Sequence, residues 1–474
     1  MSALLLSDSQ PNSLQLTDSE YPERVGIVYY VDFTLGNDAN LGITTALPWK
    51  TITKINAETF YEGDSILFKR GETWPGVCLR VPHDGLSFGA YGVGANPIID
   101  GQDAVECVQT VGKNNLRFED IECTQGINSG FQFNSSSNID LINCDAHDCG
   151  NDNLIFITGC KNCSVTGGKF YNAYQRVPTT LVTGIEIADG SEEIVIDGAE
   201  SYGQLDSGVG ISIHSHSDTE MPTGIEIKNC TFRNNTGIGI NIWKQDDNDD
   251  AGDEIKIHDN IMIDNTEDGI RVHKAGPALN YPSGVKMYNN LIEGNTRYAY
   301  YISAIDSLIY RNRIDGRGFL TSCQSSKFVN NSSYFVIGLG LYPIYINGAD
   351  TDNLEVKNNI VYATAAGGMM MGVDTVVVGA VDIDYNLYYL QAEGVGNTRW
   401  HWKGTSYNYA NWLINSAMDA NDPVVDEDPL WGDPPNFDFS LGAGSPAIDG
   451  GAVIPPITDG YLGTAPDCGY EERE

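Results

Sequence analysis

The central part of the chain repeats a short segment in which apolar and polar residues alternate. Clear copies read IEIKNCTFRNNT, IKIHDNIMIDNT and VKMYNNLIEGNT, and they begin 30 residues apart at Ile225, Ile255 and Val285. Alternation with a period of two is typical of a strand that buries one face. Less regular copies begin at Leu116, Ile139, Cys163, Ile194, Leu308 and Leu354. The pattern therefore predicts a stack of similar coils.

A second alternating segment lies between successive copies of the first. Its clearest examples are GIEIADG (184–190), GISIHSH (210–216), GINIWKQ (239–245) and GIRVHKA (269–275). Two or three short strands per coil of 23 to 31 residues are typical of a β-helix. A sandwich would need hairpins, and propeller blades of about 40 residues are longer than these repeats. We therefore expect an all-β fold, a single-stranded right-handed parallel β-helix (solenoid).

Asparagine recurs where the first strand of each coil ends. Asn229, Asn289, Asn312 and Asn358 are assigned to one repeat position. Asparagine tolerates the left-handed backbone conformation that a turn requires. The four side chains are expected to stack inside the turn as a hydrogen-bonded ladder, which would satisfy backbone groups that the bend leaves unpaired.

The ten cysteines do not show the paired CxxC spacing of a zinc site, since Cys160 and Cys163 form one lone pair. Cys123, Cys144 and Cys163 recur about one coil apart. They are expected to be small buried apolar residues at related places in a stack. A disulfide between some pair stays open.

The two ends of the chain depart from the repeat. Residues 47–60 carry a helical pattern after Pro48 and are expected to cap the N-terminal opening, as a solenoid requires. The C-terminal end is rich in Trp, Tyr and Pro and is expected to form an irregular cap. Its tryptophans are expected either to seal the last coils or to form a platform that binds carbohydrate; they are Trp400, Trp402, Trp412 and Trp431. The expected division is an N-terminal extension (1–26), an N-terminal cap with the first coils (27–100), the β-helix (101–390) and a C-terminal capping region (391–474).

Four segments near the two ends resemble the pectate-lyase-like superfamily of bacterial and phage β-helix proteins. They are YYVDFTLGNDANLGITTALPWKTITKIN, GDSILFKRGETW, GAYGVGANPIIDG and DPLWGDPPNFDFSLGAGSPAIDGG. The resemblance implies the parallel β-helix fold. It leaves the activity open, because the superfamily contains polysaccharide lyases, glycoside hydrolases, epimerases, phage tailspikes and inactive adhesins.

The chain is strongly acidic, with a net charge of -37. This charge argues against nucleic acid as a partner, because phosphate binding needs a basic surface. No apolar run approaches the roughly 20 residues of a membrane span, and the start MSALLLSDSQPNSLQLTDSE lacks the charged-then-apolar order of a secretory signal. We expect a location outside the cell or on a virion, reached with a signal already removed or by release without one.

The second strands predict one face with unusual chemistry. Their isoleucines and valines alternate inward, so the intervening residues point outward. Three of the seven histidines, His214, His216 and His273, fall on this face. Aligned by their glycines, the strands give two outward columns: Glu186, Ser212, Asn241 and Arg271; and Ala188, His214, Trp243 and His273. Asp189, Ser215, Lys244 and Lys274 follow at the strand exit.

This face suggests cleavage of a uronate-containing polysaccharide by β-elimination. That reaction needs a cation to neutralise the carboxylate, a base and an acid. Arg271 or a bound Ca²⁺ is the candidate neutraliser, Lys244 or His214 the candidate base, and His273 the candidate acid. The residues expected to bind the sugar are Trp243, Lys274, Asn241, Glu186 and His216.

Known β-helix lyases give partial support to these roles. Those that cleave alginate or chondroitin resemble this chain in placing Lys and Arg on neighbouring coils, as Lys244 and Arg271 are here. The DPH signature of β-helix epimerases and the paired-Asp and GHG motifs of polygalacturonases are missing, which makes those classes less favoured.

Calcium is the one cofactor that the sequence suggests, and no organic cofactor is expected. The acidic segment QDDNDDAGDE (245–254) leads out of the strand that carries Trp243. Its carboxylates are the hard oxygen ligands that Ca²⁺ prefers, with Asp246, Asp247 and Asp189 as the expected ligands. The spacing does not fit an EF-hand, so an exposed acidic turn is the alternative.

Two other functions stay open. A glycoside hydrolase needs two carboxylates roughly 5 to 9.5 Å apart, and Glu186 with Asp189, or either with Asp218, Glu220 or Asp246, are candidate pairs. A non-catalytic phage tailspike or adhesin would use the same face only to hold sugar, and as a tailspike it is expected to be a homotrimer. In each case the expected partner is a polysaccharide.

Overall fold

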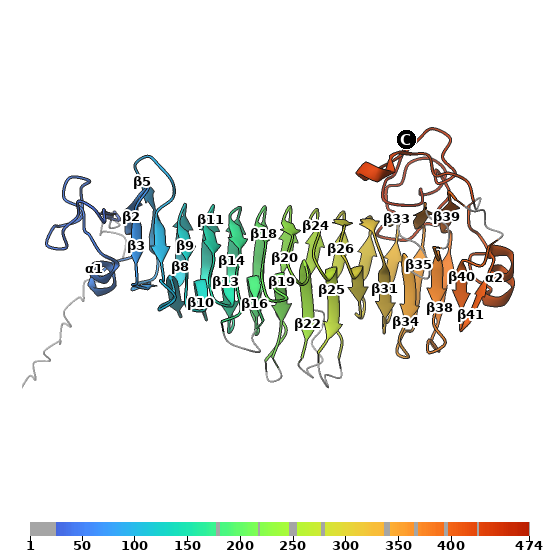
Figure 1. The fold of residues 1–474 in the computed structure, drawn as a ribbon, viewed down its shortest axis with the longest axis horizontal. Coiled ribbons are helices and arrows are strands. Elements are labelled where there is room, and N and C mark those ends of the chain that lie inside the picture. The colour runs from blue at the N-terminus through green and yellow to red at the C-terminus, as the bar shows by residue number, and fades with distance from the viewer. Residues whose placement is uncertain are drawn as a thin grey trace, which may run out of the picture.

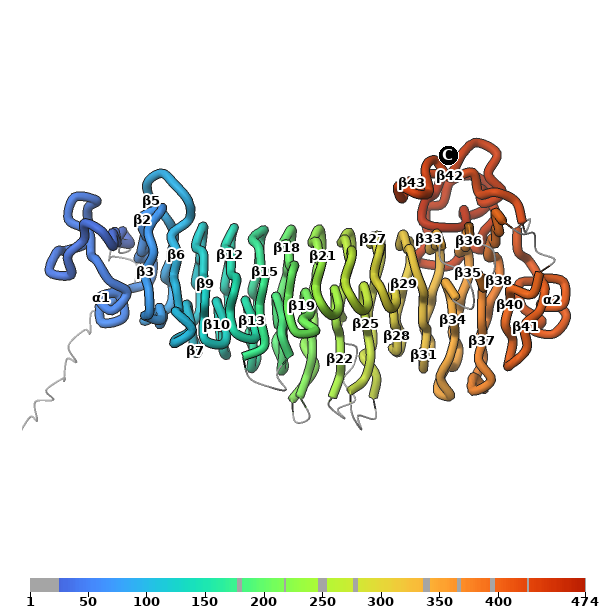
Figure 2. The backbone as a smooth tube through the Cα atoms, viewed as in Figure 1, coloured from blue at the N-terminus to red at the C-terminus, as the bar shows by residue number. Residues whose placement is uncertain are grey.

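The computed structural model describes residues 25–176, 181–216, 219–245, 254–275, 280–335, 342–364, 368–392, 397–423 and 426–473. These residues form an elongated rod of β-coils (Figures 1 and 2). Each coil contributes one strand to each of three long sheets, named sheets A, B and C, in which neighbouring strands come from successive coils. The predicted parallel β-helix is confirmed.

The strands of the three sheets have the following bounds. Sheet A contains β1 (Val28–Val31), β2 (Ser65–Lys69), β5 (Ser87–Tyr91), β8 (Asn114–Glu119), β11 (Ser137–Ile142), β14 (Lys161–Thr166), β17 (Glu192–Asp197), β20 (Glu226–Lys228), β23 (Lys256–His258), β26 (Lys286–Tyr288), β29 (Leu308–Tyr310), β32 (Lys327–Val329), β35 (Leu354–Lys357) and β38 (Val381–Asp384). Sheet B contains β3 (Thr73–Pro75), β6 (Ile98–Asp100), β9 (Glu122–Thr124), β12 (Asp145–His147), β15 (Lys169–Tyr171), β18 (Glu200–Tyr202), β21 (Thr231–Arg233), β24 (Ile261–Ile263), β27 (Leu291–Glu293), β30 (Arg313–Asp315), β33 (Ser332–Phe335), β36 (Ile360–Ala363) and β39 (Leu387–Leu390). Sheet C contains β4 (Leu79–Arg80), β7 (Val108–Val111), β10 (Ser129–Asn134), β13 (Asp152–Ile157), β16 (Thr183–Ala188), β19 (Val209–His214), β22 (Ile240–Lys244), β25 (Asp268–Lys274), β28 (Tyr298–Ile302), β31 (Gly318–Thr321), β34 (Ile344–Asn347), β37 (Met371–Val373), β40 (Trp400–Trp402) and β41 (Thr405–Tyr407).

The core runs along the inside of the coils as ladders of apolar side chains. In sheet C, Ile185, Ile211, Ile240 and Ile270 occupy one register position of four successive strands, and each has an exposed fraction of 0%. Burial of apolar area at about 25 cal/mol per Å² drives this stacking. Because inward and outward residues alternate, the buried ladders fix which side chains face the solvent.

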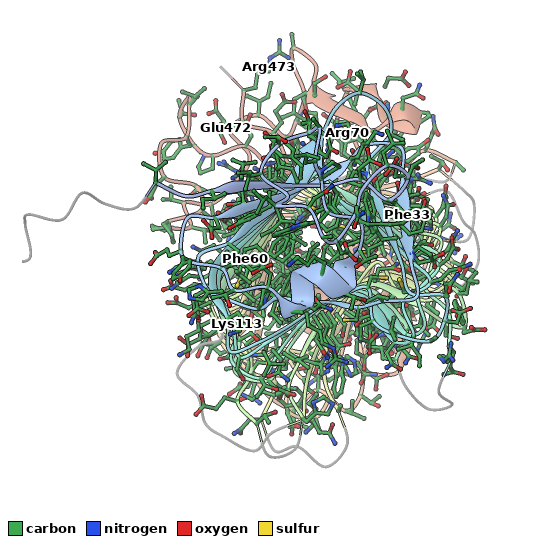
Figure 3. The ribbon with its side chains drawn as sticks, turned by 90° about the vertical axis from the view of Figure 1, so that its left-hand side faces the viewer. Phe33, Phe60, Arg70, Lys113, Glu472 and Arg473 are labelled. Carbon is green, nitrogen blue, oxygen red and sulfur yellow. The ribbon has the colours of Figure 1, made fainter. Side chains whose placement is uncertain are left out.

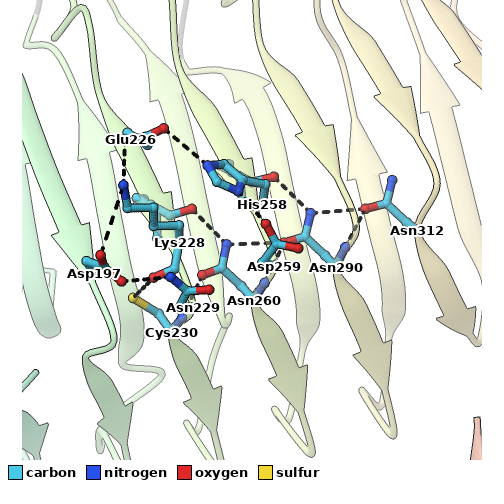
Figure 4. A network of polar contacts seen from close by, with 12 residues as sticks. Asp197, Glu226, Lys228, Asn229, Cys230, His258, Asp259, Asn260, Asn290 and Asn312 are labelled. Atoms are coloured by element: carbon cyan, nitrogen blue, oxygen red, sulfur yellow. Dashed lines mark hydrogen bonds and ion pairs between the residues drawn. The ribbon is translucent and has the colours of Figure 1, made fainter. Parts of the chain in front are cut away.

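The asparagine ladder exists, but three of the four residues predicted for it lie one position before the ladder (Figure 4). Asn312 is the residue that was predicted correctly. The buried ladder runs from Asn260 Nδ2 to Asn290 Oδ1 (3.1 Å), from Asn290 Nδ2 to Asn312 Oδ1 (3.0 Å) and from Asn312 Nδ2 to Asn331 Oδ1 (2.9 Å). It continues through Asn359 and Asn386.

The other three predicted ladder residues serve the turn in a different way. Asn229, Asn289 and Asn358 lie one position earlier and hold the left-handed conformation, with φ of 55°, 57° and 57°. In the coil of Asn312 the equivalent residue is Arg311, with φ of 52°. Each turn therefore uses two consecutive polar positions, one for its backbone shape and one for the ladder.

All ten cysteines are free and buried, so the disulfide that the sequence left open does not form. Cys123 lies in β9 of sheet B, Cys163 in β14 of sheet A, and Cys144 just before β12. The three thiols do belong to the hydrophobic core. The prediction that they occupy related places in one stack is wrong, because they are 21 and 19 residues apart, whereas these coils repeat after 23 and 24 residues.

The two ends carry the helices. Helix α1 (Ile52–Ala57) begins at the N-cap Thr51 and buries Ile52 and Ile55. Figure 3 looks onto this end, where the blue helix lies across the end of the coils. Helix α2 (Tyr409–Ser416) buries Trp412 near the other end, and Trp400 is buried beside it in the same core.

The last part of the chain turns back along the rod. It contains the antiparallel pair β42 (Trp431–Asp433) and β43 (Asp438–Leu441), joined by a 3₁₀ turn at Pro434–Asn436. Asn358 Nδ2 donates to Ala452 O (2.8 Å) and Asn330 Nδ2 donates to Asp467 O (2.9 Å). Figure 1 shows this segment against the edge of the rod near β33 and β39, away from the ends of β31 and β34 in sheet C.

Candidate functional site

The outer face of sheet C brings the predicted columns together. Glu186 is paired with Ser212, Ser212 with Asn241, and Asn241 with Arg271. His214 is paired with Trp243, which is paired with His273. The strand alternation read from the sequence therefore placed these side chains correctly.

Two adjoining hollows, which we call the sheet C groove, lie on this face. The first has a volume of about 390 Å³ and is lined by Asn151, Asp152, Ile155, Leu181, Glu186, His214, His216 and Trp243. The second has a volume of about 260 Å³ and is lined by Leu181, Ser207, Val209, Ile238, Asn241, Trp243, Glu267, Arg271 and His273. Because both hollows share Leu181 and Trp243, they form one elongated depression across several coils.

A pair of carboxyl groups, Asp152 and Glu186, lines the first hollow. Their side chains hydrogen-bond to each other. Burial and the adjacent Asp152 raise the pKa of Glu186 well above its ordinary value, and burial raises the pKa of Asp152 to about 7. Two buried carboxylates in contact repel each other, so the pair keeps one proton near neutral pH.

The hydrogen bonds around the pair favour Glu186 as the residue that carries the proton. Thr183 Oγ1 donates to Asp152 Oδ1 at 2.6 Å, which stabilises the ionised form of Asp152. A proton on Glu186 can then be donated to Asp152 when the site is empty.

His214 lies directly beside Glu186, with 3.4 Å between its Nε2 and Glu186 Oε1. Burial lowers the pKa of His214 to about 3, so the ring is neutral. Trp243 Nε1 donates to Ser212 Oγ (3.2 Å), and Ser212 Oγ lies 3.2 Å from His214 Nδ1. When the Ser212 hydroxyl donates to Nδ1, the imidazole proton is on Nε2, the nitrogen that faces Glu186.

Trp243 also fixes the plane of this histidine. The two rings stack with their centroids 4.4 Å apart and their planes at 6°. Trp243 is partly exposed and lines both hollows. It can therefore contact a ligand in either hollow while it holds His214 in place.

Asp189 follows β16 and contacts His216, one of the residues that line the first hollow. Thr219 Oγ1 donates to Asp189 Oδ1 (2.6 Å), and His216 Nδ1 lies 2.9 Å from the same oxygen. Burial by itself would raise the pKa of Asp189, but the hydrogen bonds from Thr219 and His216 lower it below the ordinary value. Asp189 is therefore ionised where Glu186 is protonated.

The second hollow contains an arginine whose charge is already paired. Arg271 Nη2 lies 2.8 Å from Glu267 Oε2, and Arg271 Nε lies 2.6 Å from Asp268 Oδ2. Asn241 is buried beside them. His273 Nδ1 donates to Lys274 O (2.9 Å), and burial lowers the pKa of this histidine to about 4. Its free nitrogen is consequently a neutral acceptor.

A family model for the right-handed β-helix region matches residues 206–378. The match agrees with the three parallel sheets, and the fold is a right-handed parallel β-helix. No curated protein matches the sequence.

Solved structures resemble this β-helix at low sequence identity. A structure of XylC with xylose has a TM-score of 0.50 and 10% identity over 86% of this chain and 87% of that one. A pectate lyase, Pel9A, has a TM-score of 0.41 and 17% identity over 95% and 97%. A GH136 lacto-N-biosidase from Eubacterium ramulus has a TM-score of 0.36 and 15% identity over 84% and 67%. At such identities the likeness concerns the fold alone.

Lys244, a candidate base, is buried at the end of β22. Its exposed fraction is 1%. Lys274, by contrast, lies with its Nζ 4.3 Å from the centre of the Tyr281 ring.

Two of the three predicted calcium ligands, Asp246 and Asp247, lie outside the described residues, as does Asp218. The third, Asp189, is engaged by His216 and Thr219. Among the residues that the structure describes, no group of three or more His, Cys, Asp or Glu side chains is arranged to hold a metal ion. No helix in the same part of the chain is long and apolar enough to cross a membrane.

Asp152 is the site residue that the sequence analysis missed. It begins β13, whose segment DNLIFI is the preceding copy of the second strand, and Ile155 of that strand is paired with Glu186. The copy lacks the Gly-Ile start that aligned the other four. Alternation could not have found it, because Asp152 has the same parity as the inward residues Leu154 and Phe156 and is paired with Thr183.

Proposed function

We propose that this β-helix is a glycoside hydrolase that cleaves a polysaccharide outside the cell or at a virion surface, with Glu186 as the general acid. The observation that carries the proposal is the Asp152–Glu186 pair, which keeps one proton near neutral pH inside a hollow of about 390 Å³. A glycosidic oxygen leaves only when it is protonated, and a carboxyl group with a raised pKa supplies that proton.

The second carboxylate of the reaction is assigned to Asp189. Its lowered pKa keeps it ionised, whereas the pKa of Glu186 is raised. Two carboxyl groups whose environments separate their pKa values in this way are suited to the roles of base and acid. Asp189 would act either as a base that activates water or as a nucleophile that attacks the sugar. The Nε2–H group of His214 would stabilise the Glu186 carboxylate that is left after proton transfer.

Elimination is the less favoured reaction, because its expected residues are engaged elsewhere. Lys244 is buried, and Arg271 already pairs with Glu267 and Asp268. A uronate carboxylate would have to compete with two protein carboxylates for this guanidinium. The carboxyl pair has no such competitor in the first hollow.

A product assay tests the proposal. The protein would be incubated with neutral polysaccharides (xylan, galactomannan and dextran) and with polyuronates, with and without Ca²⁺, while reducing ends and ultraviolet absorbance are followed together. Hydrolysis predicts reducing ends without new absorbance. Absorbance that rises in step with the reducing ends would establish elimination instead, and binding without any product would establish a non-catalytic sugar-binding protein.

The pH dependence of the rate gives a separate prediction for Asp152→Asn. An uncharged neighbour removes the repulsion that helps to raise the pKa of Glu186, so the acid loses its proton at a lower pH. The alkaline limb of the kcat/KM profile should therefore move to lower pH, while the rate near pH 5 is largely kept. An alkaline limb that stays where it is in the wild type would show that Asp152 does not tune the acid.

A further inference from the structure

A row of aromatic side chains continues the sheet C groove toward the C-terminus. Along the outward column, Arg271 is paired with Tyr301, Tyr301 with Phe319, and Phe319 with Tyr345. Tyr298 and Tyr342 flank this column. We call the five residues Tyr298, Tyr301, Phe319, Tyr342 and Tyr345 the aromatic row.

The rings of the row contact one another without gaps. The centroid of Phe319 lies 5.4 Å from that of Tyr301, 5.5 Å from that of Tyr298 and 5.4 Å from that of Tyr345. Tyr298 and Tyr345 are tilted by 43° and 39° against Phe319. Tilted rings cover each other incompletely, so parts of their faces stay open.

The row lies at the surface of the described chain. All five side chains are partly exposed. The C-terminal segment, which covers other coils, lies against a different edge of the rod in Figures 1 and 2. Aromatic side chains lose little conformational entropy on binding and offer large apolar areas, so an uncovered row next to a polar hollow is suited to a ligand with apolar faces.

Gly372 makes room for the end of the row. It is paired with Tyr345 in the next strand, β37. A Cβ atom at this position would lie 2.6 Å from Tyr345 Cδ2 and 2.7 Å from Tyr342 Cε1. Only a residue without a side chain lets both rings lie this close to the sheet.

The chemistry of the row indicates an uncharged sugar. The hydroxyl groups of a pyranose lie around its edge and leave apolar C–H faces, which aromatic rings bind. A polyuronate has such faces too, but its carboxylates would be repelled by a chain of net charge -37. Neighbouring coils are about 4.8 Å apart, so the three steps from β25 to β34 span roughly 14 Å, enough for a few sugar units.

We propose that the aromatic row binds neutral sugar units of the substrate on one side of the cleavage point, so that a long polysaccharide lies along the axis of the rod. This inference rests on the proposed function for the position of the cleavage point. It goes beyond that function in naming the substrate class as a neutral polysaccharide and the row as the surface that selects long chains.

Affinity electrophoresis tests binding without any need for turnover. Wild type, Tyr301→Ala/Phe319→Ala and Tyr288→Ala would be run in gels that contain xylan, galactomannan, dextran or polygalacturonate. Tyr288 is the matched control, because it stacks between His258 and Tyr310 on sheet A, outside the groove. The wild type and Tyr288→Ala should be retarded in at least one neutral gel, and the double variant should bind at least tenfold more weakly.

Several outcomes would overturn the inference. These are equal retardation of the double variant and the wild type, retardation in polygalacturonate alone, or no retardation in any gel. Thermal unfolding checks that the double variant is folded, and the single variant Tyr298→Ala, which should also weaken binding, serves if it is not. Retardation without release of reducing ends would contradict the proposed hydrolase activity and support sugar binding by the aromatic row. Cleavage together with unchanged binding by the double variant would support the hydrolase activity and contradict the role of the row.

Discussion

Glu186→Gln should lower kcat for release of reducing ends by about 10³-fold and leave KM within a few-fold of the wild-type value. Glutamine keeps the size of the side chain and its contact with Asp152, but it cannot give a proton to the leaving oxygen. A large loss confined to kcat is the result expected for a group that acts in the transition state. Initial rates on the polysaccharide that the wild type cleaves fastest provide the measurement.

Glu192→Gln is the matched control for this variant. Glu192 lies in β17 of sheet A and pairs with Lys161 at 2.8 Å, on a different side of the rod from the groove. Its replacement should leave both constants unchanged. A Glu186→Gln enzyme with more than a tenth of the wild-type kcat would exclude Glu186 as the acid. The histidines of the groove would then be the next candidates for this role.

The sequence predicted the face of the site because alternation alone decides it. Once Ile185, Ile211, Ile240 and Ile270 point inward, the residues between them must point outward. Lys244 lies at the last position of its strand and is buried, which alternation by itself does not predict. What alternation cannot supply is the state of each charge.

Charge states depend on side-chain contacts within and between coils, which strand alternation does not specify. Arg271 looked available for a substrate carboxylate until Glu267 and Asp268 were found beside it. His214 looked like a base until burial lowered its pKa to about 3. Glu186 was expected to bind sugar or to be one of a hydrolase's two carboxylates, and its proposed role as the acid rests on burial and on Asp152, one coil away, which raise its pKa.

The asparagine ladder is a second feature whose details the sequence pattern does not determine. Two polar residues follow each first strand, and the pattern does not say which one points inward. The structure separates them, with Asn289 at a φ of 57° and Asn290 in the buried ladder. Substitutions at the two kinds of position should therefore differ sharply in effect.

Asn312→Ala should destabilise its region of the rod by about 3 kcal/mol, because it leaves several buried polar groups unpaired. Asn312 Oδ1 accepts from the backbone N–H of Asn290 (3.1 Å) and from its Nδ2 (3.0 Å), while Asn312 Nδ2 donates to Met287 O (3.1 Å). Asn289→Gly is the matched control in the adjacent coil, since glycine adopts a positive φ without strain. It should change stability by about 0.5 kcal/mol or less.

Hydrogen exchange followed by mass spectrometry reads this difference locally, because each coil of a solenoid contacts only its neighbours. Peptides from residues 285–316 should exchange about 100-fold faster in Asn312→Ala and at nearly the wild-type rate in Asn289→Gly. Equal acceleration in both variants would mean that the ladder bonds contribute no more than the backbone conformation of the turn. A difference of the expected size would show that the amides of this ladder hold the coils in register from Asn260 to Asn386.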